Sequence, residues 1–211
     1  MSEQVKHEPG SSRRASVVEE SVADSLVERA VAMAAHCIST SRRVDMQRMS
    51  AELDVSRVTL FRHVGGRDRI LGQALWRLTA RTLAAAERRY DDAPSARYRT
   101  VGVIHLFNEM VSSAPGLHDL LDREPALAIR VLTDPRGAVE PGVVTAVQVM
   151  LERDRAECGL ELTIEPGALA FALVRLGESF LYADALASRT PDLHTANRLQ
   201  QALIEGGGPD A

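Results

Sequence analysis

The sequence predicts an all-α protein, with a three-helix head at the N-terminus joined to a larger helical bundle at the C-terminus. Apolar residues recur at helical spacing from about residue 23 to residue 204, and no segment alternates like a half-buried strand for long enough to count. Gly and Pro mark the joints between the periodic segments. A chain of 211 residues that is 45% hydrophobic is also long enough to bury a sizeable core.

The beginning of the chain predicts a tail followed by two helices. Residues 1–20 are polar and contain Pro, Gly and a run of Ser, which is typical of a disordered tail. Apolar residues at helical spacing predict a first helix over about residues 23–38. Asp45 is a suitable N-cap for a second helix, in which Met46 and Met49 fall on one side.

The third helix of the head has several local signals in register. Ser56 is a good N-cap, and Val55 and Leu60 occupy the N′ and N4 positions of a hydrophobic staple. Leu60 and Val64 then face the core together. The glycine pair that starts at Gly65 is expected to end this helix.

A long fourth helix is expected to connect the head with the bundle. It begins near Arg67, carries an apolar stripe through residue 78 and ends before Pro94. The expected domains are therefore a helix-turn-helix head over 21–67, a connecting helix over 68–93, a bundle over 94–205 and a flexible C-terminus over 206–211.

Within the bundle, Pro and Gly separate further helices. Thr190 and Pro191 suit the N-cap and first position of the last helix. The expected helices cover about residues 97–113, 117–123, 125–132, 141–158, 166–188 and 190–204.

Charge is distributed unevenly along the chain. The net charge is -4, yet residues 41–90 hold 11 basic and 5 acidic residues, so that this segment is at +6 and the remainder at -10. A basic segment attracts phosphate backbones through counterion release, whereas an acidic bundle does not coat nucleic acid. A solvated Arg-rich face would give the same charge pattern, so charge alone does not decide between the two interpretations.

Residues 45–64 fit a helix-turn-helix, whose second helix enters the DNA major groove. When its apolar side faces the core, helical geometry turns Val58, Phe61 and Arg62 outward. Apolar groups there can meet thymine methyls, and arginines can bond guanine edges or phosphates. Arg67 is expected at a phosphate, because free N–H groups at a helix start favour anions. The candidate DNA contacts are Gln47, Arg48, Ser56, Arg57, Val58, Thr59, Phe61, Arg62, His63 and Arg67.

The stretch MQRMSAELDVSRVTLFRHVGGRDRILGQAL resembles the N-terminal motif of TetR-family transcriptional regulators. Thr59, Leu60 and Phe61 stand in the place of the family's Thr-Leu-Tyr, and Arg67 stands where the family often has a phosphate-binding Lys. Asp54 departs from the usual turn Gly, and Val58 departs from the usual small residue, which bears on the operator sequence. The resemblance implies a homodimer that binds a palindromic operator, usually as a repressor, and a C-terminal domain that holds a small-molecule effector.

The stretch LVRLGESFLYADALASRTPDL resembles the C-terminal domain of the QsdR-like subgroup of that family. This resemblance implies a small amphipathic effector such as a γ-lactone or an acyl-homoserine lactone, and a role in quorum sensing. Helical spacing places two sets of polar side chains on common faces, where they can converge on a ligand. An ion pair between Arg175 and Glu178, and a satisfied core imidazole at His105, are the alternatives for these residues. The candidate ligand contacts are His105, Asn108, Arg175, Glu178 and Tyr182.

Other classes of function have weaker support. No His pair has metal-ligand spacing, and neither a nucleophile elbow nor a phosphate-binding loop occurs, so we expect no enzyme activity, no metal and no cofactor. A ligand-independent architectural DNA-binding protein remains an alternative, although the bundle exceeds what dimerisation needs. The absence of a signal peptide and of a long apolar run favours a cytoplasmic protein with no membrane partner.

Overall fold

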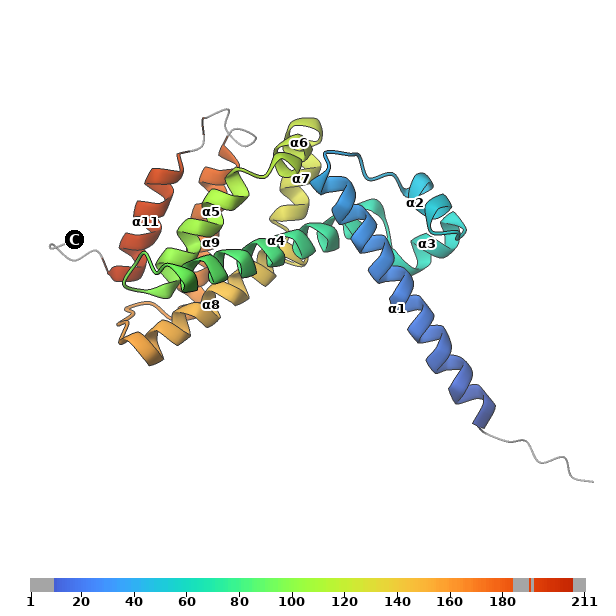
Figure 1. The fold of residues 1–211 in the computed structure, drawn as a ribbon, viewed down its shortest axis with the longest axis horizontal. Helices are drawn as coiled ribbons and strands as arrows, with labels where there is room; N and C mark the ends of the chain where they lie inside the picture. The colour runs from blue at the N-terminus through green and yellow to red at the C-terminus, as the bar shows by residue number, and fades with distance from the viewer. Residues whose placement is uncertain (1–9, 184–189, 191, 207–211) are drawn as a thin grey trace, which may run out of the picture.

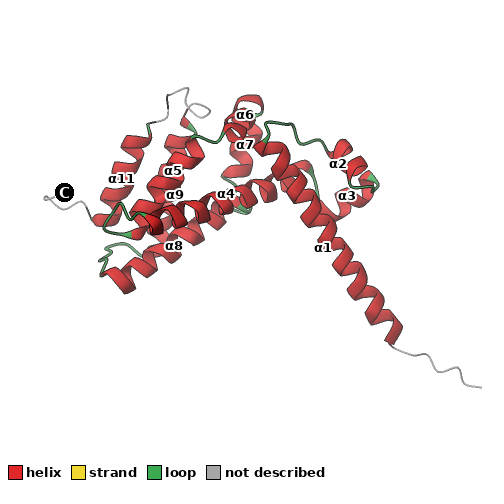
Figure 2. Ribbon diagram, in the orientation of Figure 1, coloured by secondary structure: helices red, strands yellow, loops and turns green. Residues whose placement is uncertain are grey.

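The computed structural model describes residues 10–183, 190 and 192–206, and every regular element in these ranges is a helix (Figures 1 and 2). This confirms the all-α prediction. The small head, at the end where α2 and α3 lie, is joined to the larger bundle by the long helix α4, which runs alongside α8 (Figure 1).

Four helices form the head and its connection to the bundle. They are α1 (Gly10–Ser39), α2 (Met46–Glu52), α3 (Arg57–Val64) and α4 (Arg67–Asp92).

Six further helices form the bundle. They are α5 (Arg99–Ser112), α6 (Pro115–Arg123), α7 (Pro125–Leu132), α8 (Val139–Cys158), α9 (Pro166–Leu181) and α11 (Leu193–Glu205). Helix α8 packs along α9, and α11 packs on α9 and α5.

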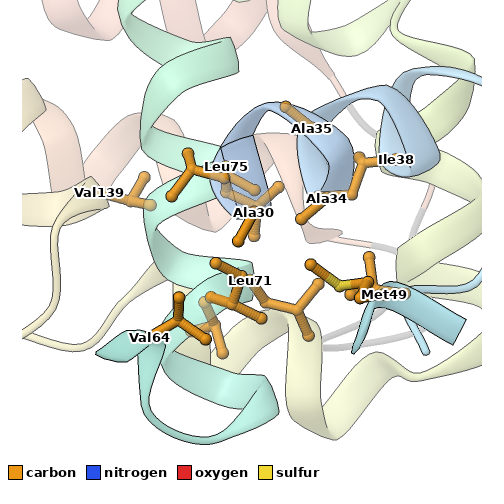
Figure 3. Packing of buried hydrophobic residues seen from close by; sticks show 14 of the residues in the cluster. Ala30, Ala34, Ala35, Ile38, Met49, Val64, Leu71, Leu75 and Val139 are labelled. Atoms are coloured by element: carbon orange, nitrogen blue, oxygen red, sulfur yellow. The ribbon is translucent and has the colours of Figure 1, made fainter. Parts of the chain in front are cut away.

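Two clusters of buried apolar side chains hold the two parts together. The first lies where α1, α2, α3 and the beginning of α4 meet, and Figure 3 shows Met49, Val64, Leu71 and Leu75 within it. It also includes residues of α6 and α7, so the core of the head continues into the bundle. The second cluster fills the space between the end of α4 and helices α5, α8 and α9. Helix α4 therefore contributes to both cores.

The boundaries of three helices, α1, α9 and α11, differ from those expected. Helix α1 begins at Gly10, earlier than the expected start near residue 23, and residues 1–9 lie outside the described residues. Extending an existing helix is far easier than nucleating one, and the added segment contains several good helix formers. Helix α9 ends at Leu181, before the expected end at Ser188.

The last helix begins later than expected. Its N-cap is Asp192, whose carboxylate accepts a hydrogen bond of 3.0 Å from the backbone N–H of Thr195. Thr190 is therefore not the cap, and Pro191 lies outside the described residues. An aspartate is a better cap than a threonine, and this carboxylate satisfies one of the free N–H groups of the first turn. Gly206 ends the helix, while residues 207–211 lie outside the described residues.

Within the described residues, no helix combines the length and the apolar character that are needed to span a bilayer.

Candidate nucleic-acid interface and effector cavity

Short-range hydrogen bonds shape the helix-turn-helix as the sequence predicts. The carboxylate of Asp45 accepts from the backbone N–H groups of Gln47 and Arg48 at 2.7 and 3.1 Å. These backbone bonds, that of Arg48 first, lower the pKa of Asp45. The hydroxyl of Ser56 accepts from the N–H of Thr59 at 3.0 Å and caps α3. Both short helices thus start where their caps place them.

The turn between α2 and α3 depends on a left-handed residue. Asp54 has φ +55°, and an aspartate is among the few side chains that tolerate this conformation. The aspartate therefore supplies the backbone geometry for which a glycine would be the ordinary choice at this turn. The departure from the family pattern at Asp54 leaves the motif intact.

The outer face of α3 combines apolar and basic side chains. Leu60 and Val64 are buried on the inner side, at 1% and 0% exposure. On the outer side Val58 is 78% and Phe61 64% exposed, with exposed Arg62 beside them. Solvent exposure of a valine and a phenylalanine on one face of a short helix has no explanation in the packing of the head.

The other candidate DNA contacts on α2 and α3 are exposed or half-buried. Arg57 is exposed, and Thr59 and His63 are half-buried. On α2, Gln47 and Arg48 are exposed. The candidates on α2 and α3 are therefore all at least partly accessible to solvent.

Arg67, a candidate phosphate contact, is held by bonds within the protein. Its Nη1 and Nη2 atoms each donate at 2.6 Å to the carboxylate of Glu124, and its Nε donates to the carbonyl of Val44 at 2.8 Å. Three guanidinium donors are thus used inside the protein. The pair raises the pKa of Arg67 and lowers that of Glu124, in each case chiefly through the side-chain hydrogen bonds between them.

An apolar cavity of about 240 Å³ lies in the bundle, close to the head. Residues of α4, α5, α6, α8 and α9 line it, together with Ile38 at the end of α1 and Gln200 of α11. Apolar side chains dominate the lining, as is usual for small-molecule sites.

Three of the five candidate ligand contacts line this cavity: Asn108, Glu178 and Tyr182. His105 is not among the lining residues and its ring bonds to the backbone carbonyl of Asn197 at 3.1 Å. Arg175 is also outside the lining, and its Nη1 donates to Glu178 at 2.8 Å. For these two residues the structure favours the alternatives of a satisfied imidazole and an ion pair.

Sequence reasoning missed Glu140, which lines the cavity from the first turn of α8 and is 4% exposed. Its Oε2 atom is buried and has no hydrogen-bond partner among the described residues. The guanidinium of Arg175 lies 3.7 Å from that atom. Burial, opposed by Arg175 and reinforced by Glu140, raises the pKa of Glu178 to about 7. Burial also raises the pKa of Tyr182.

In the described part of the chain, no group of three or more His, Cys, Asp or Glu side chains is placed to hold a metal ion. The arrangement thus consists of an exposed mixed face on the head and an apolar cavity with an acidic wall in the bundle.

Comparisons with known proteins bear on the family and the fold. Residues 97–205 match the family model described as "Tetracyclin repressor-like, C-terminal domain". The chain is similar to the solved structure of the TetR-family transcriptional repressor QsdR of R. erythropolis, with a TM-score of 0.78 and 30% sequence identity. The similarity covers 86% of this chain and 95% of that one. No curated protein sequence matches the chain significantly.

Proposed function

Because this chain belongs to the TetR family of transcriptional regulators, we propose that it is a homodimeric repressor released from a palindromic operator by a small amphipathic effector. The exposed face of α3 carries the DNA-binding part of the proposal. Val58 and Phe61 stand on a helix that is fixed at both ends, by the Ser56 cap and by Gly65, with arginines beside them. Such a face suits base contacts in a major groove.

Helices α8 and α9 support the dimeric part of the proposal. They pack against each other, and each leaves a large apolar side chain in solvent: Val149 at 58% and Phe171 at 51% exposure. A two-fold axis that packs α8 and α9 against their copies in a second subunit would bury such side chains. The two recognition helices would then read half-sites whose centres lie about 34 Å apart, or a multiple of that distance.

The cavity supports the effector-responsive part of the proposal. It lies between helices that also touch the head, since Ile38 of α1 and the beginning of α6 belong to its lining. A ligand that favours one arrangement of these helices shifts the equilibrium between two dimer geometries, of which only one fits the operator.

The test is binding of the purified protein to the promoter fragment upstream of its own gene and to those of neighbouring genes, with a shuffled fragment as control. Salt should be varied, and amphipathic compounds, including γ-lactones and acyl-homoserine lactones, should be added. We expect salt-sensitive, sequence-specific binding that at least one compound abolishes. Specific binding that no compound alters would instead favour a ligand-independent architectural protein, and binding to no fragment would contradict the proposal.

A further inference from the structure

We propose that the effector of the cavity is an amphipathic cation, an amine with an apolar chain, and that Glu140 and Glu178 bind its ammonium group. The inference rests on the proposed function and names the chemical class of the ligand. It differs from the lactone class, because neither a γ-lactone nor an acyl-homoserine lactone carries a positive charge.

Among the described residues, the acidic wall has two carboxyl groups and one neighbouring guanidinium. Two carboxylates line the cavity, and one guanidinium, that of Arg175, lies within 4.0 Å of both. The Arg175 side chain is 46% exposed and makes its hydrogen bond to Glu178, whereas it lies 3.7 Å from Glu140. An uncompensated buried carboxylate is costly, so a cationic ligand at this place replaces a penalty with an ion pair.

Glu140 provides a second observation, independent of the acidic pair. Its side chain is 5% exposed, and the buried Oε2 atom accepts no hydrogen bond from any described residue. Buried carboxylate oxygens nearly always have donors, so an orphaned one on a cavity wall indicates where a ligand donor belongs.

The remaining polar groups of the wall also favour a donor on the ligand. The side-chain amide of Asn108 donates hydrogen bonds to the side chains of Asn197 and Gln200, at 2.8 and 2.9 Å. Its carbonyl oxygen remains as an acceptor. The amide nitrogen of Gln200 donates to the backbone carbonyl of Leu173 at 2.9 Å. Hydroxyls at Thr79 and Tyr182 can donate or accept. The wall therefore offers more acceptors than donors.

The apolar lining of the cavity indicates that the rest of the ligand is apolar. Leu78, Ile104 and Val147 belong to a surface on which an alkyl or aryl body loses its contact with water. A cation without such a body gains only the ion pair, which does not suffice for desolvating the ammonium group.

The test is a calorimetric titration of the full-length protein with octylamine, octanol, octanoate and γ-octalactone, which differ mainly in the polar head. We expect octylamine to bind about tenfold more tightly than octanol or the lactone, as a charged hydrogen bond to a buried carboxylate implies. Glu140→Gln and Glu178→Gln should each remove most of this preference while leaving octanol affinity within about twofold. The matched control is Glu161→Gln, which alters an exposed carboxylate in the loop before α9.

Equal or tighter binding of octanol, octanoate or the lactone would overturn the cationic class, as would an octylamine preference that both glutamine variants retain. Binding of none of the four compounds would overturn it as well. These failures are distinguishable from failure of the proposed function, because promoter binding and its release by another compound are measured without reference to amines. Thermal unfolding of the variants confirms that each is folded, and the comparison of octylamine with octanol in the unmodified protein needs no variant at all.

Discussion

Arg67, at the first position of α4, donates two parallel hydrogen bonds of 2.6 Å to Glu124, at the junction of α6 and α7. The same carboxylate lies 3.6 Å from Arg43 in the connection between α1 and α2. Glu124, which lies between α6 and α7, thus connects the bundle to two segments of the head. Arg67, which the sequence predicts to contact DNA, thus also links the head to the bundle.

We expect Glu124→Gln to lower the free energy of unfolding by about 1–2 kcal/mol, because it breaks a half-buried bidentate pair and leaves the arginine charge without compensation. A double-mutant cycle with Arg67→Ala, measured by urea unfolding, should give a coupling of about 1 kcal/mol or more. The control cycle uses Arg153 and Glu157, an exposed pair on α8, for which about 0.5 kcal/mol or less is expected. Equal couplings in the two cycles would contradict the structural role.

The helix-turn-helix could be predicted because its determinants are local. Asp45 and Ser56 cap the helices that they precede by one residue, so sequence spacing suffices. The partner of Arg67 is 57 residues away, and no pattern along the chain connects it with Glu124. Helical periodicity indicates which face is buried, but it does not tell which other segment covers that face.

The cavity could be predicted only in part for the same reason. Helical spacing predicts Asn108, which shares a face of an otherwise apolar helix with His105, and Glu178, which shares a face with other polar side chains. Glu140 gave no such signal, since a glutamate in the first turn of a helix is ordinarily exposed and favoured by the helix dipole. Its burial results from the packing of α8 against other helices, which the sequence does not display.

Truncation of two adjacent residues of α3 should affect different properties: the stability of the fold at Leu60 and operator binding at Phe61. Leu60→Ala is expected to lower the free energy of unfolding by about 2–5 kcal/mol, since that side chain is fully buried. Phe61→Ala should change it by less than about 0.5 kcal/mol and weaken specific operator binding by about tenfold. Urea unfolding and fluorescence anisotropy with labelled operator measure the two effects. A large loss of stability from Phe61→Ala would mean that the ring serves the fold.

Two glycines should differ sharply when alanine replaces them. A Cβ atom at Gly116, on α6, would clash with the backbone carbonyl of Ile38 at the end of α1. Gly116→Ala therefore has to push α6 away from the head, and we expect a loss of about 1–3 kcal/mol in the free energy of unfolding. At Gly72, inside α4, the added Cβ would lie 3.5 Å from Val131, an ordinary contact. Gly72→Ala should be neutral or stabilise by up to about 1 kcal/mol, since alanine favours the helix.

Promoter binding of the Gly116 variant tests whether α6 couples the cavity to the head. Gly116 lines the cavity and also touches α1, so displacement of α6 should weaken operator binding in the absence of any effector. The Gly72 variant serves as the control, with operator affinity expected within about twofold of that of the unmodified protein. Unchanged affinity in the Gly116 variant, at temperatures where it remains folded, would show that this contact transmits nothing to the head.

The raised pKa of Glu178 makes stability depend on pH in a direction that can be worked out. Burial is the main cause of the value of about 7, with Arg175 opposing it and Glu140 adding to it. Between the ordinary value of 4.5 and about 7, the folded chain holds a proton that the unfolded chain has released. The free energy of unfolding contributed by this group therefore falls as pH rises through that window.

The Glu178→Gln variant, which is neutral at this position throughout, tests this dependence. It should reduce the decline by on the order of 1–2 kcal/mol, which is less than full linkage because the cavity opening and Arg175 screen the charge. Urea unfolding between about pH 5 and about pH 7.5 measures the effect, with Glu161→Gln expected to leave the slope unchanged. The groups whose pKa is lowered, such as Glu124 and Asp45, lose their contribution only as pH falls below their ordinary values, so they do not obscure this window. An identical slope in the Glu178→Gln variant would mean that the Glu178 carboxyl of the unmodified protein is hydrated, and the acidic wall would then lack the desolvated carboxyl that favours a cation.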